Sequence, residues 1–521
     1  MPMHALIPWA ALALAPAVAP VNPTAPAPAA APIASPAPVT AAPAPGPAPV
    51  TPAPVSPATT SAAPVTSVAP VPTSAAPGTP VTTSAATTSA TPTTSAGPVP
   101  TIGGGVTAAP TAAPAPSKFL PPSDPAKMAE APVDGGRSKW KPGTGLEVGT
   151  QDKRFTLQFG LMAQLQVPIH HTPLIPGMNG AMDTPAVNDV TLQFRRARMS
   201  LGGNVFSQHI KYKIQFTMAP IELGFKDGVP HRVPILDWFF TFDKFRDATF
   251  QVGQYKVPYN HQRMLRVVGM QFVDRSAANN EFTMDRDIGL DIRSKDVGGL
   301  GKLRYYAGVY LGDGIAKYGA SDSGFMYLGR VEVLPFGQYD DLEEADHERS
   351  LKPKMLIGGA YAFIDRDPHD NHGFFGAIPA DGGTTSTHNA TGDINFRWAG
   401  FSFEGAFFWR KGWRQPGKNL DAMGEPIPTV LARNGLGYFT QAGYLLPRLP
   451  IELGARWGQI VARGDATTTS LRDSNETGGV LNYYFARHAL KLQLDYLKTW
   501  NPGLGVRYGT DQVRLQLQVT F

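Results

Sequence analysis

Apolar and polar residues alternate along much of the chain from residue 146 onwards. The clearest stretch is Asp511 to Phe521, where every second residue is apolar and Arg514, Gln516, Gln518 and Thr520 stand between them. A period of two predicts a strand with one apolar and one polar face. Because an open edge of this kind invites pairing with other chains, a closed barrel is favoured. With lipid outside and water inside, the pattern predicts an outer-membrane β-barrel.

The same alternation predicts about 16 antiparallel strands, an even number within the range of bacterial barrels. We expect them at Arg154–Val167, Val190–Leu201, Ile210–Met218, Leu236–Phe242, Phe250–Gln254, Ile288–Ile292, Leu303–Leu311, Phe325–Leu334, Met355–Ile364, Asp393–Ala399, Phe401–Arg410, Gly437–Leu446, Ile451–Ile460, Thr477–Phe485, Ala489–Trp500 and the terminal stretch. Short connections, such as Gly202–His209 and Ala399 with Gly400, alternate with long ones such as Pro168–Asp189 and Pro258–Arg286. Membrane barrels have short periplasmic turns and long external loops. The long, acidic Gln338–Ser350 is an exception, since this count places it on the periplasmic side.

Composition divides the chain into four parts. No Lys, Arg, Asp or Glu occurs before Lys118, and Ala, Pro, Thr, Ser and Val make up almost all of residues 21–117. Such a segment cannot bury enough apolar surface to offset its ordering entropy, so we expect a disordered, partly polyproline linker. Residues 118–145 then form a periplasmic lead-in, and residues 146–521 form the all-β, 16-stranded transmembrane barrel.

The N-terminus favours export. Ala5–Ala19 is an apolar run too short to span a bilayer, and Ala/Pro-rich sequence follows it. This arrangement predicts a signal peptide over residues 1–20, although only His4 precedes the run in place of a basic segment. The chain has no cysteine, so disulfides and thiolate metal sites are excluded.

Basic residues occupy the polar face of two neighbouring predicted strands. They are Arg196 and Arg198 on one strand and Lys211 and Lys213 on the next. Cations lining a water-filled bore would concentrate anions and repel cations. The alternative is that they pair with inward carboxylates such as Asp237, Asp291, Glu332 and Asp495 and only neutralise the wall.

The long connection Pro258–Arg286 carries further cations, Arg263, Arg266 and Arg275. It stands where a barrel can fold a loop inward, and a constriction there would strengthen the electrostatic effect of each cation on a passing anion. The alternative is an external loop that contacts lipopolysaccharide or a neighbouring protomer. Arg196, Arg198, Lys211, Lys213, Arg263, Arg266 and Arg275 are therefore our candidate anion-binding lumen residues.

Several segments together resemble the phosphate-selective porin O and P family of trimeric, 16-stranded outer-membrane channels. They are FRRAR at Phe194–Arg198, VGQYKVPY at Val252–Tyr259, RDIGLDI at Arg286–Ile292, YAGVYLGDG at Tyr306–Gly314 and TGGVLNYYF at Thr477–Phe485. The resemblance spans roughly Leu146 to Phe521 and implies passive, anion-preferring diffusion through each protomer of a homotrimer. The linker departs from the compact family pattern, and we expect it to reach a periplasmic or cell-wall partner.

These observations favour a porin for small anions, phosphate or polyphosphate, in contact with outer-membrane lipid and lipopolysaccharide. We expect no enzyme activity, cofactor, metal or nucleic-acid partner. A structural or adhesive barrel with an incidental pore is the alternative. The DPHDNH sequence at Asp367–His372 could ligate a metal, but a solvated loop is the favoured interpretation. No nucleophile elbow is present.

Overall fold

The computed structural model describes residues 131–133, 136–175, 183–226, 229–230, 234–315, 324–373, 376–465 and 467–521. The predicted signal peptide, the predicted linker and residues 118–130 of the predicted lead-in lie outside the described residues. No helix within the described part of the chain is long and apolar enough to cross a membrane.

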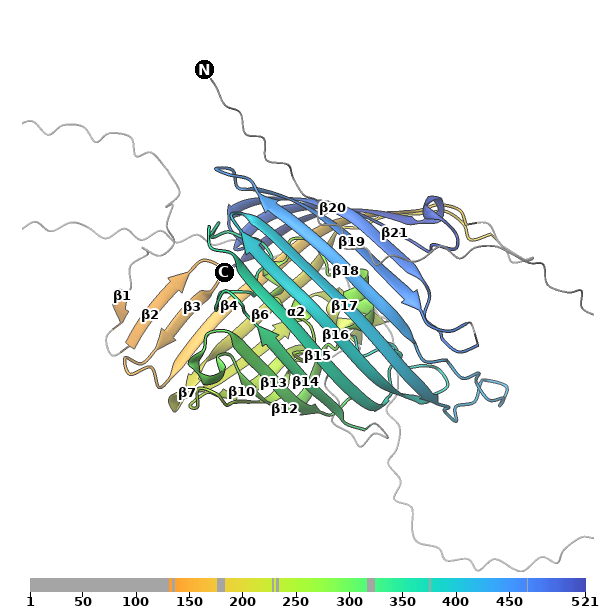
Figure 1. Cartoon of the computed structure of the whole chain (residues 1–521), viewed down its shortest axis with the longest axis horizontal. Helices are drawn as coiled ribbons and strands as arrows, with labels where there is room; N and C mark the ends of the chain where they lie inside the picture. Colours follow the sequence, from red (N-terminus) through yellow and green to blue (C-terminus); the bar gives the residue numbers. More distant parts are fainter. Residues whose placement is uncertain are drawn as a thin grey trace, which may run out of the picture. The chain divides into compact units, whose positions relative to one another are not determined.

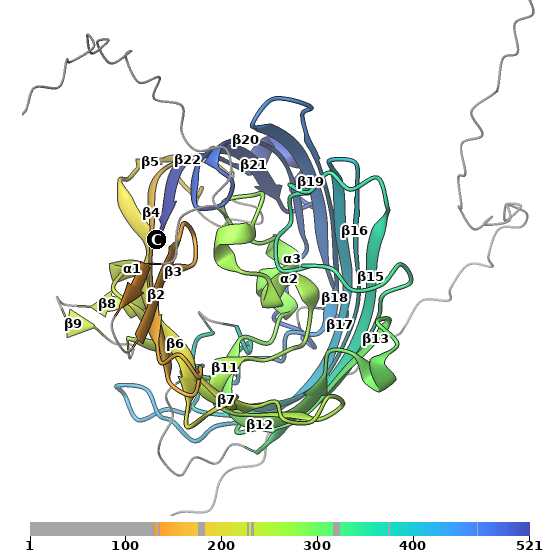
Figure 2. The ribbon, with the colours of Figure 1, turned by 90° about the vertical axis from the view of Figure 1, so that its left-hand side faces the viewer.

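The strands form one closed antiparallel barrel of 16 members (Figures 1 and 2). Each strand pairs with the next along the chain, and the last pairs with the first through Thr520 opposite Met162. The barrel strands are β4 (Thr156–Thr172), β6 (Gln193–Val205), β7 (Ser207–Thr217), β10 (Ile235–Phe242), β11 (Thr249–Lys256), β12 (Arg286–Ser294), β13 (Leu303–Tyr310), β14 (Met326–Val333), β15 (Lys354–Asp367), β16 (Thr384–Trp398), β17 (Phe401–Gln415), β18 (Gly435–Leu445), β19 (Ile451–Ala462), β20 (Ser474–Ala486), β21 (Leu490–Trp500) and β22 (Thr510–Thr520). The predicted fold class is confirmed.

The barrel wall is apolar outside and polar inside, as the alternation predicts. On β22, Leu515 is 44% exposed whereas Gln516 is fully buried. Exposed leucines beside buried glutamines reverse the order found in a water-soluble domain. This arrangement suits a wall whose outer face meets hydrocarbon.

The two ends of the barrel differ in the length of their connections. At the short-turn end, Ala399 and Gly400 join β16 to β17 with φ angles of 53° and 94°. Positive φ at both positions matches the twist of a two-residue hairpin. The predicted turn Gly202–His209 is wrong, since β6 runs to Val205 and β7 begins at Ser207. A strand continues beyond the apolar belt, where its outward residues are polar. The alternation of apolar and polar residues therefore stops before the strand does, and the predicted strand is too short.

Small elements extend the barrel at both ends. β1 (Ala131–Val133), β2 (Gly136–Lys141) and β3 (Gly145–Gly149) form a meander, and β3 pairs with β4 beyond the last pair of β22 (Figure 1). The remaining elements are α1 (Pro220–Leu223), β5 (Val187–Val190), β8 (Phe225–Lys226), β9 (Val229–Pro230), η3 (Val297–Gly299) and η4 (Val506–Tyr508). In Figure 2, the helices of the connection between β11 and β12 lie inside the ring of strands.

Candidate functional site: a basic passage through the bore

The connection between β11 and β12, residues 257–285, folds into the bore, and we call it the inward loop. It contains α2 (His261–Met264), η2 (Val267–Gly269) and α3 (Ala277–Phe282) (Figure 2). Carboxylates of the far wall hold it. The Val273 amide donates to Asp495 Oδ2 at 3.1 Å, and the Ala277 amide donates to Glu476 Oε2 at 3.0 Å. The loop therefore lies against β16–β21 and leaves the opposite wall open.

A second segment enters from the short-turn end. It is the connection between β14 and β15, residues 334–353, which we call the acidic connection. The Arg266 amide of the inward loop donates to Leu342 O at 3.2 Å, and the Glu344 amide donates to Gly269 O at 2.8 Å. Although this segment leaves the wall at the short-turn end, it turns into the bore and contacts the inward loop on the side that faces this end.

The two segments cover the inner face of half the barrel. Inward side chains of β16–β22, such as Asn395, Gln441, Asn482 and Gln518, are buried although they are polar. The open space includes two cavities, one of about 340 Å³ towards the long-loop end and one of about 450 Å³ towards the short-turn end. The first is lined by β6, β11, β12, β20, β21, β22 and the inward loop, and the second mainly by β4–β12. Arg198, Lys256, Val267 and Arg286 line both cavities, so they lie where the two adjoin.

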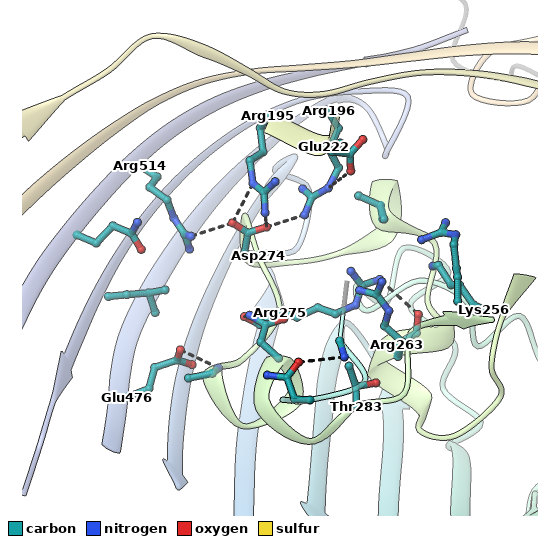
Figure 3. A pocket seen from close by; sticks show the side chains of 18 of the residues that line it. Arg195, Arg196, Glu222, Lys256, Arg263, Asp274, Arg275, Thr283, Glu476 and Arg514 are labelled. Carbon is teal, nitrogen blue, oxygen red and sulfur yellow. Dashed lines mark hydrogen bonds and ion pairs between the residues drawn. The ribbon is translucent and has the colours of Figure 1, made fainter. Parts of the chain in front are cut away.

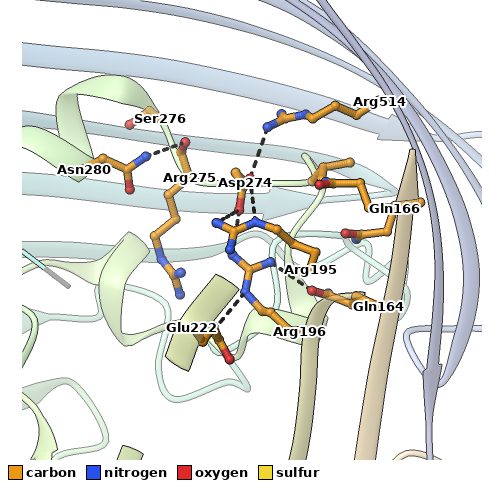
Figure 4. Close-up of polar contacts among 12 residues, drawn as sticks. Gln164, Gln166, Arg195, Arg196, Glu222, Asp274, Arg275, Ser276, Asn280 and Arg514 are labelled. Atoms are coloured by element: carbon orange, nitrogen blue, oxygen red, sulfur yellow. Dashed lines mark hydrogen bonds and ion pairs between the residues drawn. The ribbon is translucent and has the colours of Figure 1, made fainter. Parts of the chain in front are cut away.

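Three guanidinium groups converge on one carboxylate of the inward loop (Figures 3 and 4). Asp274 accepts from Arg196 Nη2 at 2.6 Å, from Arg514 Nη1 at 3.1 Å and from Arg195 Nη2 at 3.2 Å. Burial by itself would raise the pKa of Asp274, but the three arginines outweigh it and lower that pKa. The cluster keeps an excess of positive charge beside the passage.

A β-bulge explains why two consecutive arginines both face inward. In the pairing of β4 with β6, Arg196 lies opposite Gln164 and Phe194 lies opposite Leu165, so Arg195 is the extra residue. A bulge of this kind re-aims side chains. Our prediction missed Arg195. The odd spacing of the outward residues Phe194 and Ala197 is the signal that reveals the bulge.

Several other cations of the passage are paired. The buried Arg198 donates through Nε to Glu222 at 3.1 Å, and Arg286 donates to Asp237 at 2.6 Å. Burial would raise the pKa of Glu222, yet Arg198 and then Arg196 lower it to about 2. Arg263 of the inward loop pairs with Asp285. Carboxylates neutralise the cations in these pairs, so the alternative interpretation holds for part of the passage.

Three cations of the two cavity linings form no ion pair with a described carboxylate. Lys256 donates to Leu265 O at 2.9 Å, Arg275 donates to Gln262 O at 2.8 Å, and Lys213 forms no hydrogen bond within the described part of the chain (Figure 3). Burial, followed by the neighbouring Arg263 and Arg196, lowers the pKa of Arg275 well below its ordinary value. A nearby anion would relieve this repulsion. Lys256 was missed because its place in VGQYKVPY gives no hint that it faces the passage.

The remaining candidates lie at the short-turn end. Lys211 is half exposed and pairs with Asp243. Arg266 pairs with Asp340 at 2.8 Å and lines the cavity at that end. The structure thus brings Arg196, Arg198, Arg263 and Arg275 together at the first cavity and places Lys213 and Arg266 at the second, with Lys211 outside both linings. Their role in anion binding stays a prediction.

Asp367 and His372, the first and last residues of the DPHDNH sequence, are buried, so the prediction of a solvated loop was wrong for them. His372 is buried, with Nδ1 at 3.0 Å from Asp367 and Nε2 at 3.2 Å from Asp287. Burial would lower the pKa of His372, but Asp367 and Asp287 raise it to about 10. The cluster is an ion-paired brace beside the inward loop. Within the described ranges, no group of three or more His, Asp and Glu side chains is placed to hold a metal ion.

The family model described as phosphate-selective porin O and P matches residues 178–322. The predicted resemblance is confirmed. The family match and the barrel fold support an outer-membrane diffusion channel. No curated protein matches the porin sequence.

Several solved structures of outer-membrane proteins are similar to this chain. The channel DcaP of Acinetobacter baumannii is 9% identical with a TM-score of 0.43, and the match covers 70% of this chain and 97% of that one. OmpF of Salmonella typhi in complex with daunomycin is 12% identical with a TM-score of 0.43, covering 74% and 100%. An anion-selective porin from Comamonas acidovorans is 11% identical with a TM-score of 0.41, covering 70% and 100%.

Proposed function

We propose that this porin is an anion-preferring diffusion channel whose favoured cargo is phosphate or polyphosphate. The observation that carries the proposal is the charge of the cavity towards the long-loop end. Eight Lys and Arg side chains line it (Arg195, Arg196, Arg198, Lys256, Arg263, Arg275, Arg286 and Arg514), against three carboxylates, Glu222, Asp274 and Glu476. Asp237, Asp285 and Asp495 lie outside this lining but pair with Arg286, Arg263 and Arg514, so the net excess is two positive charges around a space of about 340 Å³.

An excess of this size acts strongly at short range. A unit charge attracts an opposite one by about 4 kcal/mol at 4 Å near a protein surface, against about 1 kcal/mol in bulk water. Arginine also offers planar donor pairs that match phosphate oxygens. Small anions would therefore be concentrated in the passage and cations repelled, with no cofactor, metal or catalytic step required.

The wider assembly belongs to the same proposal. We expect a homotrimer in the outer membrane, surrounded by lipid and lipopolysaccharide, with the linker over residues 21–117 extending into the periplasm towards a cell-wall or periplasmic partner. The exposed apolar belt, including Leu290, Val309 and Tyr327, supports the contact with lipid.

Planar bilayers test the proposal directly. The full chain is reconstituted across a potassium chloride gradient, and the reversal potential is expected to show chloride passing more readily than potassium. Phosphate added to one side is expected to inhibit the chloride current. A cation-biased reversal potential would overturn the anion preference, and a barrel without conductance would favour the structural or adhesive alternative. Chloride current insensitive to phosphate would leave a general anion channel and remove phosphate as the favoured cargo.

A further inference from the structure

The acidic connection is fastened to the barrel wall by a pair of imidazole rings. The ring centroid of His347 lies 4.7 Å from that of His488, which belongs to the turn between β20 and β21, at an interplanar angle of 85°. Tyr484 packs edge-on against both rings, at 4.5 and 5.3 Å. Nε2 of His347 and both ring nitrogens of His488 have no hydrogen-bond partner among the described residues. The contact is therefore one between neutral aromatic rings.

Both signs of charge surround this pair. The cations facing it are Arg487 on the same turn, Lys491 on β21, Arg397 on β16 and Arg266 on the inward loop. The acids are Glu343, with Oε2 at 3.7 Å from His488 Nε2, Glu344 and Glu452. Glu343 is shared with Arg266 at 3.8 Å, Glu344 accepts from the Gln271 amide, and Glu452 accepts from Tyr484. None of the three lies within 3.5 Å of a ring nitrogen of the pair.

We propose that His347 and His488 form an acid-sensitive latch: as neutral rings they hold the acidic connection inside the bore, and protonation of both releases its second half and widens the pore. Two imidazolium groups at this separation, beside Arg487 and Lys491, repel one another. Once residues 343–349 leave the wall, inward side chains that they contact, such as Gln441, which donates to Glu344 Oε2 at 2.9 Å, become accessible to water.

The direction of the pH effect follows from the neutral, buried state of the rings. Burial, then Arg487, Lys491 and Arg397, lowers the pKa of His347 to about 3, and burial, then Lys491 and His347, lowers that of His488 well below its ordinary value. Both rings are neutral in the latched state, so this state is favoured above about pH 6.5, the ordinary pKa of histidine. Below that pH, protonation favours the released state, in which the pKa is higher. Each ring shifts the equilibrium by up to about tenfold per pH unit, so two give up to about 100-fold.

The first half of the acidic connection stays anchored in acid. Asp341 accepts from Arg304 Nη1 at 3.0 Å and lies 3.5 Å from His261 Nε2. Burial would raise the pKa of Asp341, but His261 and Arg304 lower it, so these pairs persist in moderate acid. Release must instead break the bonds of Glu344 to Gly269 and Gln271, the bond from the Gly400 amide to Asp346 Oδ2 at 2.7 Å, and the bond from Arg349 to Leu445 O. Movement is thereby confined to the part after Asp341.

Single-channel recording of the full-length porin at about pH 7.5 and about pH 4.5 tests the latch. The wild type is expected to populate a higher-conductance level in acid. The double variant His347→Phe with His488→Phe keeps the ring packing but removes the titration, and it should lack that level at either pH. The matched control is His171→Gln, at the long-loop end, which should respond like the wild type. An acid response retained by the double variant, or absent from the wild type, overturns the proposal.

A reversible tether provides a second test in which both histidines remain. Ala345 of the acidic connection packs with Leu445 of β18 in one buried cluster, and the native chain has no cysteine. The variant Ala345→Cys with Leu445→Cys, oxidised, should lose the acid-induced level and regain it after reduction. A disulfide-linked channel that still reaches the higher level overturns the latch. Anion preference at neutral pH is read separately from the reversal potential, so failure of the latch leaves the proposed function standing.

Discussion

The carboxylate of Asp274 lies 2.6 Å from the guanidinium of Arg196, although one belongs to the inward loop and the other to strand β6 of the wall. Arg195 and Arg514 approach the same carboxylate from either side. Arg514 also donates to Asp495 at 2.6 Å, so three positive charges face two negative ones and the cluster keeps an excess of one. Asp274 thus acts as a built-in counter-ion that an incoming anion must share or displace.

Asp274→Asn is expected to strengthen the inhibition of chloride current by phosphate. Removing this counter-ion frees Arg195 and Arg196 from Asp274, while Arg514 stays paired with Asp495, and we expect half-inhibition at roughly tenfold lower phosphate concentration, equivalent to about 1.4 kcal/mol. The control is Asp243→Asn, because Asp243 pairs with Lys211 at the short-turn end, outside both cavity linings. Equal inhibition of the two variants would show that the Asp274 cluster lies off the path of the anion.

Lys213 and Lys211 allow the contribution of position to be separated from that of charge. Lys213 lines the second cavity and forms no ion pair among the described residues, whereas Lys211 is half exposed and paired with Asp243. Lys213→Glu should reduce the chloride-to-potassium permeability ratio about fivefold, on the order of 1 kcal/mol, and Lys211→Glu should change it much less. Reversal potentials across a salt gradient measure both ratios. A larger effect of Lys211→Glu than of Lys213→Glu would mean that anions pass closer to Lys211 than to Lys213.

The inward loop fits against the wall because β18 presents a glycine to it. A Cβ atom at Gly437 would lie 2.5 Å from the ring of Phe282 on α3, so a side chain there must push α3 into the passage. We expect Gly437→Val to lower the single-channel conductance and to cost about 1–3 kcal/mol of stability from overpacking. At Gly329 on β14, by contrast, a Cβ atom meets nothing within 4 Å, and Gly329→Val serves as the control. Equal conductance in both variants would mean that α3 does not border the path.

Local periodicity was enough to predict the closed barrel. Residues such as Leu515 and Gln516 take opposite faces because successive side chains in a strand do so, and a face that meets lipid must be continuously apolar. Closure follows once every strand has two neighbours. The strand ends were less accurate, since β4 continues through Pro168 to Thr172 and pairs there with β22.

The interior of the barrel depends on contacts between distant residues, which a period-two pattern does not contain. Nothing near Leu342 in the sequence shows that its carbonyl accepts from Arg266, so the inward course of the acidic connection was not foreseen. Lys256 likewise faces the passage only because the inward loop passes beside it. The paired and unpaired cations are therefore distinguished by tertiary contacts. Parity accounts for the inward position of Arg196, Arg198 and Lys213 but not for that of Arg195 or Lys256.

His261 links the inward segments to the wall through contacts that are lost at alkaline pH, whereas the latch opens in acid. Its Nδ1 lies 2.8 Å from Glu404 on β17 and its Nε2 lies 3.5 Å from Asp341 on the acidic connection, so one imidazolium joins the wall and both inward segments. Burial by itself would lower the pKa of His261, but Glu404 and Asp341 raise it to about 10. A folded pKa above 6.5 means that this stabilisation is complete below pH 6.5 and disappears as the pH rises through about 10.

Between about pH 7 and about pH 10.5 the wild-type channel should therefore become noisier and unfold at lower temperature. His261→Gln should lose the increase in noise and keep only the part of the thermal destabilisation that comes from His372, whose pKa is also about 10. The effect should grow by up to about tenfold in the open-to-closed ratio per pH unit until the folded pKa is passed. Single-channel noise and thermal unfolding measure it, with His171→Gln again as the control. Since the latch and His261 titrate with opposite sign, His347→Phe with His488→Phe should abolish only the acid response and His261→Gln only the alkaline one. Loss of both responses in either variant would contradict two independent contacts.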